Sequence, residues 1–265
     1  MGNPSLTESL LADAEIDNLY KRATQSQFLR LGGQGRLERA TLSEWLSQDR
    51  LYAQAYIRFI GGLISRVKMP VEAAAKGGAS ATLQWRILTL LQGCLAGIMR
   101  ELRFFEEAAS SYNLDLAAAY PGEQRFGPNA TTKSYIELFD SFTTKPQEES
   151  PRTLFDGLVV LWATEMAYLA AWSYANQHSG QHDAVTDFET DLDGGALRKL
   201  FIPNWTSQPF RDFVEEIREC VDAYAESQTG EDNADARFVT AAAMVKKVFV
   251  LEEGFWPLIG ADEVV

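Results

Sequence analysis

Histidine is almost absent from this sequence, which has two in 265 residues, His178 and His182. No residue before position 178 can therefore serve as an early haem-binding histidine, and the helical part of the chain cannot build a Ser–His–Asp arrangement. A carboxylate di-metal bundle needs a Glu-x-x-His pair, and Tyr168 stands where the histidine after Glu165 would be. Any proton chemistry must rest on carboxylates, tyrosines or water.

Cysteine and positive charge are also scarce. Cys94 and Cys220 lie far apart in apolar, helix-like surroundings, which indicates two reduced core thiols and neither a disulfide framework nor a metal motif. The formal net charge is −13, and no basic stripe offsets it, so we expect no nucleic-acid partner. No apolar run reaches the roughly 20 residues needed to span a bilayer, and the start MGNPSLTESLL does not resemble a signal peptide. We therefore expect a cytoplasmic protein without a membrane partner.

Helical periodicity dominates what is present, and no two-residue alternation is sustained. Capping residues, glycines and prolines divide the pattern into helices, one of them starting after Thr41 with Glu44 completing a capping box. No stretch resembles a domain linker. The sequence predicts one all-α domain over residues 1–265. Its expected helices span about residues 7–31, 41–67, 81–112, 130–140, 151–177, 209–226 and 235–256.

Four of these helices carry an acid on a stripe of apolar and aromatic residues: Asp49, Glu101, Glu165 and Glu252. Burying one ionised carboxylate without partners costs several kcal/mol, so acids placed in this way must converge on something polar. Helical bundles build their sites from inward-facing side chains of this kind. Acids among aromatic rings suit a flat heterocycle, whose amino groups they bind and whose faces the rings cover.

Other interpretations of the acids stay open at this point. Each of the four could lie at a stripe edge and pair with a cation, and Glu101 has Arg100 and Arg103 beside it. A carboxylate-only metal enzyme using Glu101, Glu165 and Glu252 is a further alternative. The acid-rich segment 178–195 is expected to be a solvated surface. Its acids are Asp183, Asp187, Glu189, Asp191 and Asp193.

Four short motifs resemble the TenA (thiaminase-II) family in order and spacing, across roughly residues 25 to 260. In the first, a Gln–Asp pair is followed by tyrosines three and seven residues after the aspartate. The second carries a tyrosine, the third is a Trp-containing turn before a helix, and the fourth is a closing Glu-x-x-Phe-Trp. In this sequence they are Gln48-Asp49 with Tyr52 and Tyr56; Lys133-Ser134-Tyr135; Asn204-Trp205 with Phe210 and Phe213; and Glu252 with Phe255-Trp256.

This resemblance implies a haem-oxygenase-like helical bundle without haem or another cofactor, and a homo-oligomer. It also implies hydrolysis of a thiamin-derived aminopyrimidine, 4-amino-5-aminomethyl-2-methylpyrimidine or its N-formyl derivative, in thiamin salvage. In the better-known branch of the family a nucleophilic cysteine precedes a tyrosine by four residues. Thr164 takes that place before Tyr168, and the segment Trp162-Ala163-Thr164-Glu165 with Tyr168 resembles the Cys-less branch instead.

The resemblance also implies roles for individual residues. Asp49 would hold the ring amino group and a ring nitrogen, Glu252 would protonate the opposite ring nitrogen, and Glu165 would be the base for an attacking water. Tyr52, Tyr56, Tyr135 and Tyr168 would shape and cap the pocket for a small-molecule pyrimidine, with no metal involved. The alternative function is a non-catalytic pyrimidine-binding or regulatory protein of the same fold.

Overall fold

The computed structural model describes residues 4–69, 79–119, 122, 125–143, 152–180, 188–228 and 234–260. Every regular element within these residues is a helix, which confirms the all-α prediction. A 3₁₀ turn, Phe188–Thr190, and a π-helical segment, Leu197–Phe201, precede the short helix α8. The α-helices are α1 (Leu6–Leu11), α2 (Ala14–Thr24), α3 (Gln27–Gly33), α4 (Arg39–Ile64), α5 (Ala79–Tyr112), α6 (Ala130–Asp140), α7 (Leu154–Gln177), α8 (Ile202–Trp205), α9 (Gln208–Ser227) and α10 (Ala234–Glu253).

The amino-terminal helix expected over residues 7–31 is in fact three helices. Asp13 caps α2 by accepting hydrogen bonds from the backbone N–H groups of Glu15 and Ile16, both at 3.0 Å. Ser26 caps α3 by accepting one from Leu29 at 3.3 Å. Each of these short polar side chains satisfies free N–H groups of a new helix, so the chain turns at both points.

Two other helix ends differ from the sequence prediction. The capping box expected at Thr41 is wrong, because α4 begins at Arg39 after Glu38 and Thr41 is buried inside the helix. The helix α7 begins at Leu154, where Thr153 and Asp156 form a capping box. Pro70 and Pro151, which stand near the predicted ends of these helices in the sequence, lie outside the described residues.

Helix α7 runs through the middle of the bundle. It packs against α2, α3, α4, α8, α9 and α10 and is apolar around most of its circumference, as a helix covered on all sides must be. By length and composition α7 also meets the requirement for a membrane span, which the sequence had not led us to expect. Because 72% of that apolar window is buried in the protein, packing within the bundle accounts for its composition.

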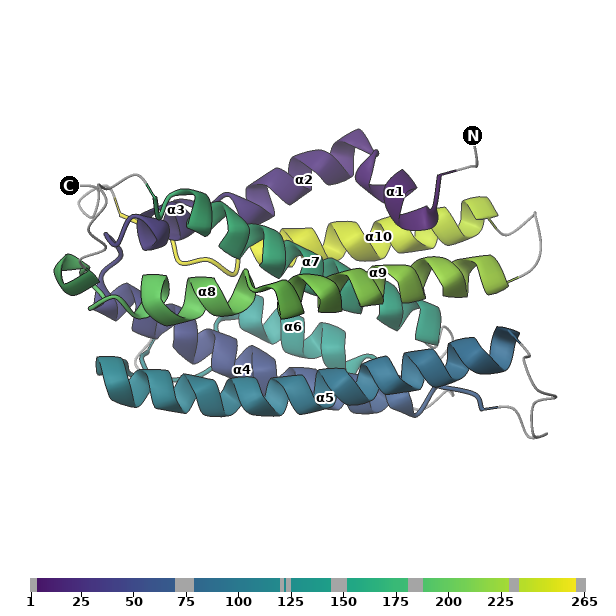
Figure 1. Ribbon diagram of the computed structural model, residues 1–265, viewed down its shortest axis with the longest axis horizontal. Helices are drawn as coiled ribbons and strands as arrows, with labels where there is room; N and C mark the ends of the chain where they lie inside the picture. Colours follow the sequence, from purple (N-terminus) through teal and green to yellow (C-terminus); the bar gives the residue numbers. More distant parts are fainter. Residues whose placement is uncertain are drawn as a thin grey trace.

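The other helices lie around α7. In Figure 1, α4 and α5 form the lower side of the molecule, α1 to α3 form the upper side, and α9 runs between them. Helix α3 lies so close to α7 at Gly33 that a Cβ atom there would be 2.0 Å from the Ala175 carbonyl oxygen. Only glycine fits at this position. Helices α4, α5, α7 and α8–α9 therefore surround one part of the interior, and the site lies there.

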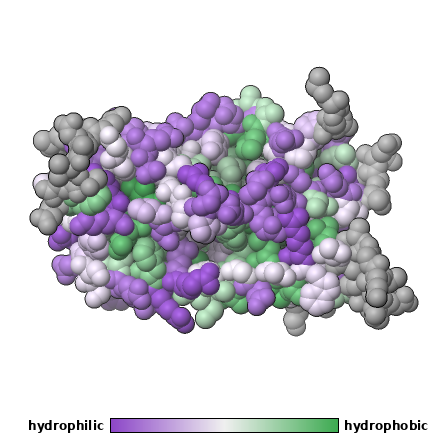
Figure 2. Space-filling view, in the orientation of Figure 1, coloured by the Kyte–Doolittle hydropathy of each residue, from purple (hydrophilic) through white to green (hydrophobic). Residues whose placement is uncertain are grey.

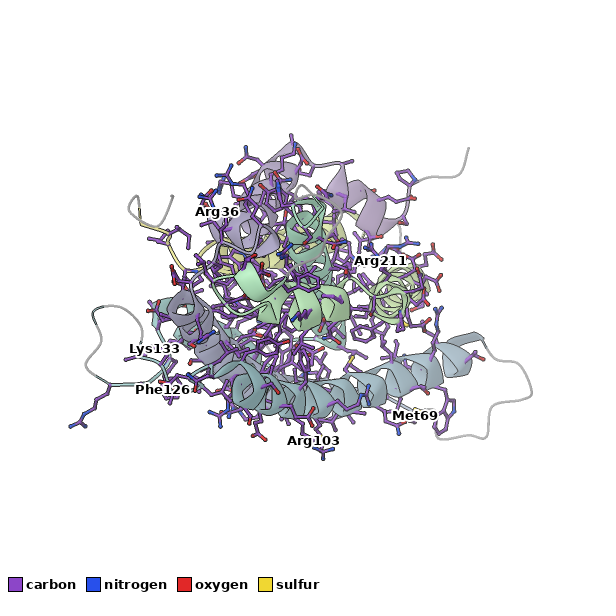
Figure 3. The ribbon with its side chains drawn as sticks, turned by 60° about the vertical axis from the view of Figure 1, so that its left-hand side comes forward. Arg36, Met69, Arg103, Phe126, Lys133 and Arg211 are labelled. Atoms are coloured by element: carbon purple, nitrogen blue, oxygen red, sulfur yellow. The ribbon has the colours of Figure 1, made fainter. Side chains whose placement is uncertain are left out.

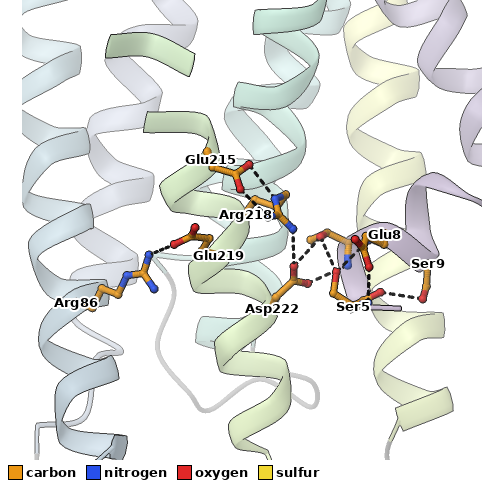
Figure 4. A network of polar contacts seen from close by, with 9 residues as sticks. Ser5, Glu8, Ser9, Arg86, Glu215, Arg218, Glu219 and Asp222 are labelled. Carbon is orange, nitrogen blue, oxygen red and sulfur yellow. Dashed lines mark hydrogen bonds and ion pairs between the residues drawn. The ribbon is translucent and has the colours of Figure 1, made fainter. Parts of the chain in front are cut away.

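Ion pairs and hydrogen bonds hold α9 against its neighbours (Figure 4). Arg86 of α5 donates to Glu216 of α9 at 2.6 Å and also pairs with Glu219. Asp222 of α9 accepts hydrogen bonds from the backbone and the hydroxyl of Thr7 in α1, at 2.9 and 2.7 Å. These contacts fix the helix that forms the outer wall of the site.

Candidate functional site

A cavity of about 550 Å³ lies between α5 and the segment formed by α8 and the start of α9. We call it the outer chamber. Phe104, Phe210 and Phe213 line it. Figure 2 shows hydrophilic and hydrophobic side chains interspersed over one face of the molecule. Gly93 and Gly97 of α5 also line the chamber, and a Cβ atom at Gly93 would meet no atom within 4 Å. The missing side chains leave the chamber wide, within the size range of small-molecule sites.

A narrow recess of about 30 Å³ continues the outer chamber toward the bundle axis. We call it the inner recess. Tyr56, Glu101, Glu165 and Trp205 line both spaces, which places the two spaces side by side. The remaining polar residues of the recess are Asp49, Tyr52, Thr164 and Tyr168.

The four acids that interrupt the apolar stripes each accept a hydrogen bond from an aromatic side chain of another helix. Tyr168 of α7 donates to Asp49 of α4 at 3.0 Å, and Tyr56 of α4 donates to Glu165 of α7 at 2.7 Å. In the first bond α7 supplies the donor and α4 the acceptor, and in the second α4 supplies the donor and α7 the acceptor. The other two donors are Trp205 Nε1 to Glu101 at 3.1 Å and the Tyr135 hydroxyl to Glu252.

Within the described part of the chain, no positively charged side chain neutralises any of the four acids. None of them forms an ion pair with a lysine, arginine or histidine that the structure describes. Arg103, which the sequence offered as a partner for Glu101, is exposed and projects away from the bundle in Figure 3. The interpretation of Glu101 as a stripe-edge acid paired with a neighbouring arginine is therefore wrong.

Burial without a cation changes the proton affinity of the acids. It raises the pKa of Asp49 to about 7 and that of Glu165 to about 7, while the Tyr168 and Tyr56 hydrogen bonds act in the opposite direction. Burial also raises the pKa of Glu252 to about 8, and the pKa of Glu101 lies well above its usual value of 4.5. The site therefore holds several carboxyl groups that exchange protons near neutral pH, as acid–base chemistry requires.

Glu252 lies behind the recess and lines neither space. Its Oε1 accepts the hydrogen bond from Tyr135, and its Oε2 is buried without a partner among the described residues. The Tyr135 ring meets Tyr52 edge-on, with centroids 5.0 Å apart, and Tyr52 lines the recess. Of the predicted site residues, Asp49, Tyr52, Tyr56, Glu165 and Tyr168 share one space, whereas Tyr135 and Glu252 form a second layer behind Tyr52.

The structure adds residues that the sequence did not assign to the pyrimidine pocket. Glu101 had been one of the four stripe acids but was given no role with the pyrimidine, and Trp205 had been assigned only to a motif, yet both line the inner recess and the outer chamber. Cross-helix contact, which periodicity does not reveal, brings them together. As for the metal alternative, no group of three or more His, Cys, Asp or Glu side chains is arranged to hold an ion among the residues that the structure describes.

The acid-rich segment 178–195 was predicted to be a solvated surface, and the structure differs from this prediction at two residues. Asp191 is buried and paired with Arg198, and the buried Asp193 accepts hydrogen bonds from the backbone of Gly195 and Leu197, both at 2.8 Å. Both acids shape the turn that leads into α8. His182, Asp183 and Asp187 lie outside the described residues.

These features define a class of protein: a helical bundle with an acid-lined internal cavity. A TenA homologue from Pyrococcus furiosus has the same fold, with a TM-score of 0.68, 22% identity, and coverage of 95% of this chain and 98% of that one. The resemblance to TenA proteins is confirmed in the fold, which is the haem-oxygenase-like bundle. No protein-family model matches the chain.

Two curated relatives are also similar in sequence. A protein of Fusarium pseudograminearum, named a probable transcription factor, is 28% identical over 257 residues, covering 88% of this chain and 48% of that protein. A Glycine max protein, named a probable bifunctional TENA-E protein, is 21% identical over 169 residues, covering 64% of this chain and 63% of that protein. The chain thus spans about half the length of the first relative and under two thirds of the second.

Proposed function

We propose that this protein is a hydrolase of a thiamin-derived aminopyrimidine, 4-amino-5-aminomethyl-2-methylpyrimidine or its N-formyl derivative, acting in thiamin salvage. One observation carries the proposal: Asp49 and Glu165 face the same recess from opposite helices, each with a pKa of about 7 and each bound to a tyrosine of the other helix. The TenA fold and the TENA-E name of the soybean relative support it.

The sizes of the two spaces support one placement of the ring. The inner recess is too small for a whole pyrimidine, whereas the outer chamber is large enough for one with its substituent. The ring therefore enters from the outer chamber with one edge toward Asp49, whose carboxyl group binds the ring amino group and a ring nitrogen. Tyr52 and Tyr168 lie beside that edge and shape the recess around it.

The pKa values divide the proton chemistry between two acids. Glu165, with a pKa of about 7, is partly ionised at neutral pH and accepts a proton from the attacking water. Glu252, with a pKa of about 8, stays protonated. Because it lies behind Tyr52 and lines neither space, its unbonded Oε2 can protonate a ring nitrogen only when Tyr52 moves aside. Water oxygen bonds to the methylene carbon as the C–N bond breaks, and the aminomethyl nitrogen, protonated as an ammonium ion, takes the electron pair of that bond and leaves as ammonia.

Thr164 supports assignment to the Cys-less, Glu-type branch. Thr164 lines the recess and donates its hydroxyl hydrogen to the Leu161 carbonyl oxygen at 2.9 Å, so the position holds no thiol nucleophile. Cys94 does line the outer chamber, but burial raises the pKa of its thiol well above the usual range. Attack by water is therefore favoured over attack by sulfur.

Incubation of the protein with the aminopyrimidine, its N-formyl derivative and thiamin, followed by mass spectrometry, tests the proposal. We expect hydroxymethylpyrimidine from one or both aminopyrimidines and no cleavage of thiamin. Asp49→Asn is the matched loss-of-function variant, because it keeps the volume and removes the carboxylate. Failure to form product from any compound would overturn the hydrolase assignment.

A second candidate is a pyrimidine-binding regulatory protein that lacks turnover. The name of the Fusarium relative favours it, although this chain spans about half of that protein. Tight binding of hydroxymethylpyrimidine by calorimetry, without product from the aminopyrimidines, would support this candidate over the first.

We further propose that the protein is a cytoplasmic homo-oligomer with no nucleic-acid or membrane partner and no cofactor. The net charge of −13 supports the first exclusion, because it opposes binding to phosphate backbones. Light scattering for the mass, a DNA-binding titration and cell fractionation are the corresponding measurements.

A further inference from the structure

Glu101 occupies the junction of the two spaces of the site. It lines both the outer chamber and the inner recess, and it comes from α5, the helix opposite the Asp49–Glu165 pair. Its Oε1 accepts the hydrogen bond from Trp205 Nε1 at 3.1 Å. Its Oε2 has no hydrogen-bond partner in the described part of the chain. One carboxylate oxygen is therefore held in place while the other is available to a ligand.

The described groups around Glu101 leave it without a compensating charge. Arg100 is exposed, and its guanidinium Nη2 lies 4.0 Å from the Cβ position of Gly97, at the rim of the outer chamber. It makes no ion pair with Glu101 among the described residues. The titratable side chains that line the site around Glu101, taken from every helix packed there, are Asp49, Tyr52, Tyr56, Cys94, Arg100, Glu165 and Tyr168.

The charge of this junction selects the substituent that fits there. A ring bound with its edge toward Asp49 leaves its substituent at the opening of the recess, beside Glu101. Carboxylates in a largely dehydrated space attract a cation strongly, while a neutral amide gains little and an anion is repelled. An aminomethyl group is an ammonium ion at neutral pH, and an N-formylaminomethyl group is uncharged.

We propose that Glu101 binds the aminomethyl nitrogen of the substrate as an ammonium ion, and thereby selects the free amine over its acylated derivative. This inference rests on the proposed function of the site. It makes Glu101 a specificity-determining residue and Trp205 its positioning residue, because the indole N–H fixes the carboxylate plane.

Binding of the ammonium group should change the protonation of Glu101. Burial raises the pKa of Glu101, and the nearby Asp49 and Glu165 raise it further, so Glu101 holds its proton more tightly than an exposed glutamate does. A bound ammonium ion takes the place of that proton, which leaves to solvent. A pyrimidine with a neutral substituent displaces no proton from Glu101.

The test compares native protein with Glu101→Gln, which keeps the volume and removes the charge. We expect kcat/KM for the aminomethyl compound to fall roughly 10- to 100-fold, mainly through KM, as befits one charge-assisted hydrogen bond. For the N-formyl compound we expect a change of less than about 3-fold. Glu106→Gln, an exposed acid of the same helix, is the matched control and should change neither value.

Calorimetry provides a readout besides activity. Binding of the aminomethyl compound to the native protein, in buffers of different ionisation enthalpy near pH 7, is expected to release protons, and binding to Glu101→Gln to release fewer. Hydroxymethylpyrimidine is the reference, and its affinity should be equal for the two proteins.

The outcomes separate the two proposals. If hydroxymethylpyrimidine fails to bind the native protein and no pyrimidine is hydrolysed, the proposed function itself is wrong. If the pyrimidine binds but Glu101→Gln keeps the native preference for the amine, or the native protein prefers the N-formyl compound, the role of Glu101 is overturned.

Discussion

The Tyr56 hydroxyl donates a 2.7 Å hydrogen bond to Glu165 across the space between α4 and α7. This bond opposes the effect of burial on the carboxyl group, and so holds the pKa of Glu165 near 7 when burial alone would raise it further. Burial thus raises the proton affinity of the proposed base, and a tyrosine 109 positions away in the sequence lowers it again.

Tyr56→Phe should therefore move the pH dependence of hydrolysis. Without the donor the pKa of Glu165 rises, and the ionised base appears only at higher pH. We expect the rising limb of the kcat profile to move to higher pH, and kcat at pH 7 to fall about 10-fold for every pH unit that the limb moves. Initial rates from pH 5.5 to 9 measure this displacement. Tyr174→Phe, outside the cavity, is the control. If the limb of the Tyr56→Phe profile stays at the native pH, Tyr56 does not influence the pKa of the base.

Glu252→Gln should abolish turnover while the protein stays folded. Glutamine keeps the volume and the hydrogen bond from Tyr135 but carries no titratable proton, and general acid–base catalysis is typically worth about 10²- to 10⁴-fold. Steady-state rates and a circular dichroism spectrum are the measurements. A kcat equal to that of the native protein would remove Glu252 from the mechanism.

The same substitution should alter how stability depends on pH. The pKa of Glu252 is about 8 in the folded protein, against an ordinary value of 4.5, so the folded state holds this proton more tightly than the unfolded state does. The burial cost is absent below about pH 4.5, grows as pH rises, and is complete above about pH 8. The melting temperature of Glu252→Gln minus that of the native protein should increase from pH 5 to pH 8.5. The exposed Glu137→Gln should show no such trend.

Removal of the Tyr56–Glu165 pair tests whether it serves activity or stability. Glu165→Leu alone leaves the buried Tyr56 hydroxyl without its acceptor, a loss that typically costs about 1–3 kcal/mol. With Tyr56→Phe added, both polar groups are gone, and we expect an inactive protein at least as stable as the parent. Urea unfolding of both single variants and the double variant measures the coupling. A double variant less stable than both singles would make the pair structural.

The two thiols should be dispensable and unreactive. Burial raises the pKa of Cys94 well above its usual range and that of Cys220 to about 11, so neither forms much thiolate at neutral pH. Replacement of both by alanine should leave pyrimidine hydrolysis largely intact, and iodoacetamide should not inhibit the native protein. Stoichiometric inactivation by one alkylated cysteine would show that the Cys-less assignment is wrong.

The sequence predicted the long helices well because their stripes repeat with the helical period. It also identified the four acids, since an acid on such a stripe faces the interior. It did not predict the partner of each acid, because contacts such as Tyr168 with Asp49 join residues 119 positions apart. The second layer formed by Tyr135 and Glu252 was hidden for the same reason.

The errors at helix ends have a different cause. The spacing of apolar residues stays helical across Asp13 and Ser26, although both residues start a new helix. This spacing indicates which face of a helix is buried, but it does not show where the backbone turns. The π-helical segment before α8 follows a turn in which Asp193 accepts hydrogen bonds from the backbone N–H groups of Gly195 and Leu197, and the acid-rich composition of segment 178–195 did not reveal that Asp193 is buried. The expectation of one domain over residues 1–265 stays a prediction.

Gly93 and Gly97 leave the substrate range of this fold open to evolutionary change. Glycine inside a helix costs about 1 kcal/mol relative to alanine, and here the side chains it omits would project toward open space in the outer chamber. One mutation to a larger residue at position 93 would narrow the site without moving any helix. Descendants of this protein can therefore exchange one ligand size for another by single steps along α5, while the acids of the inner recess stay in place.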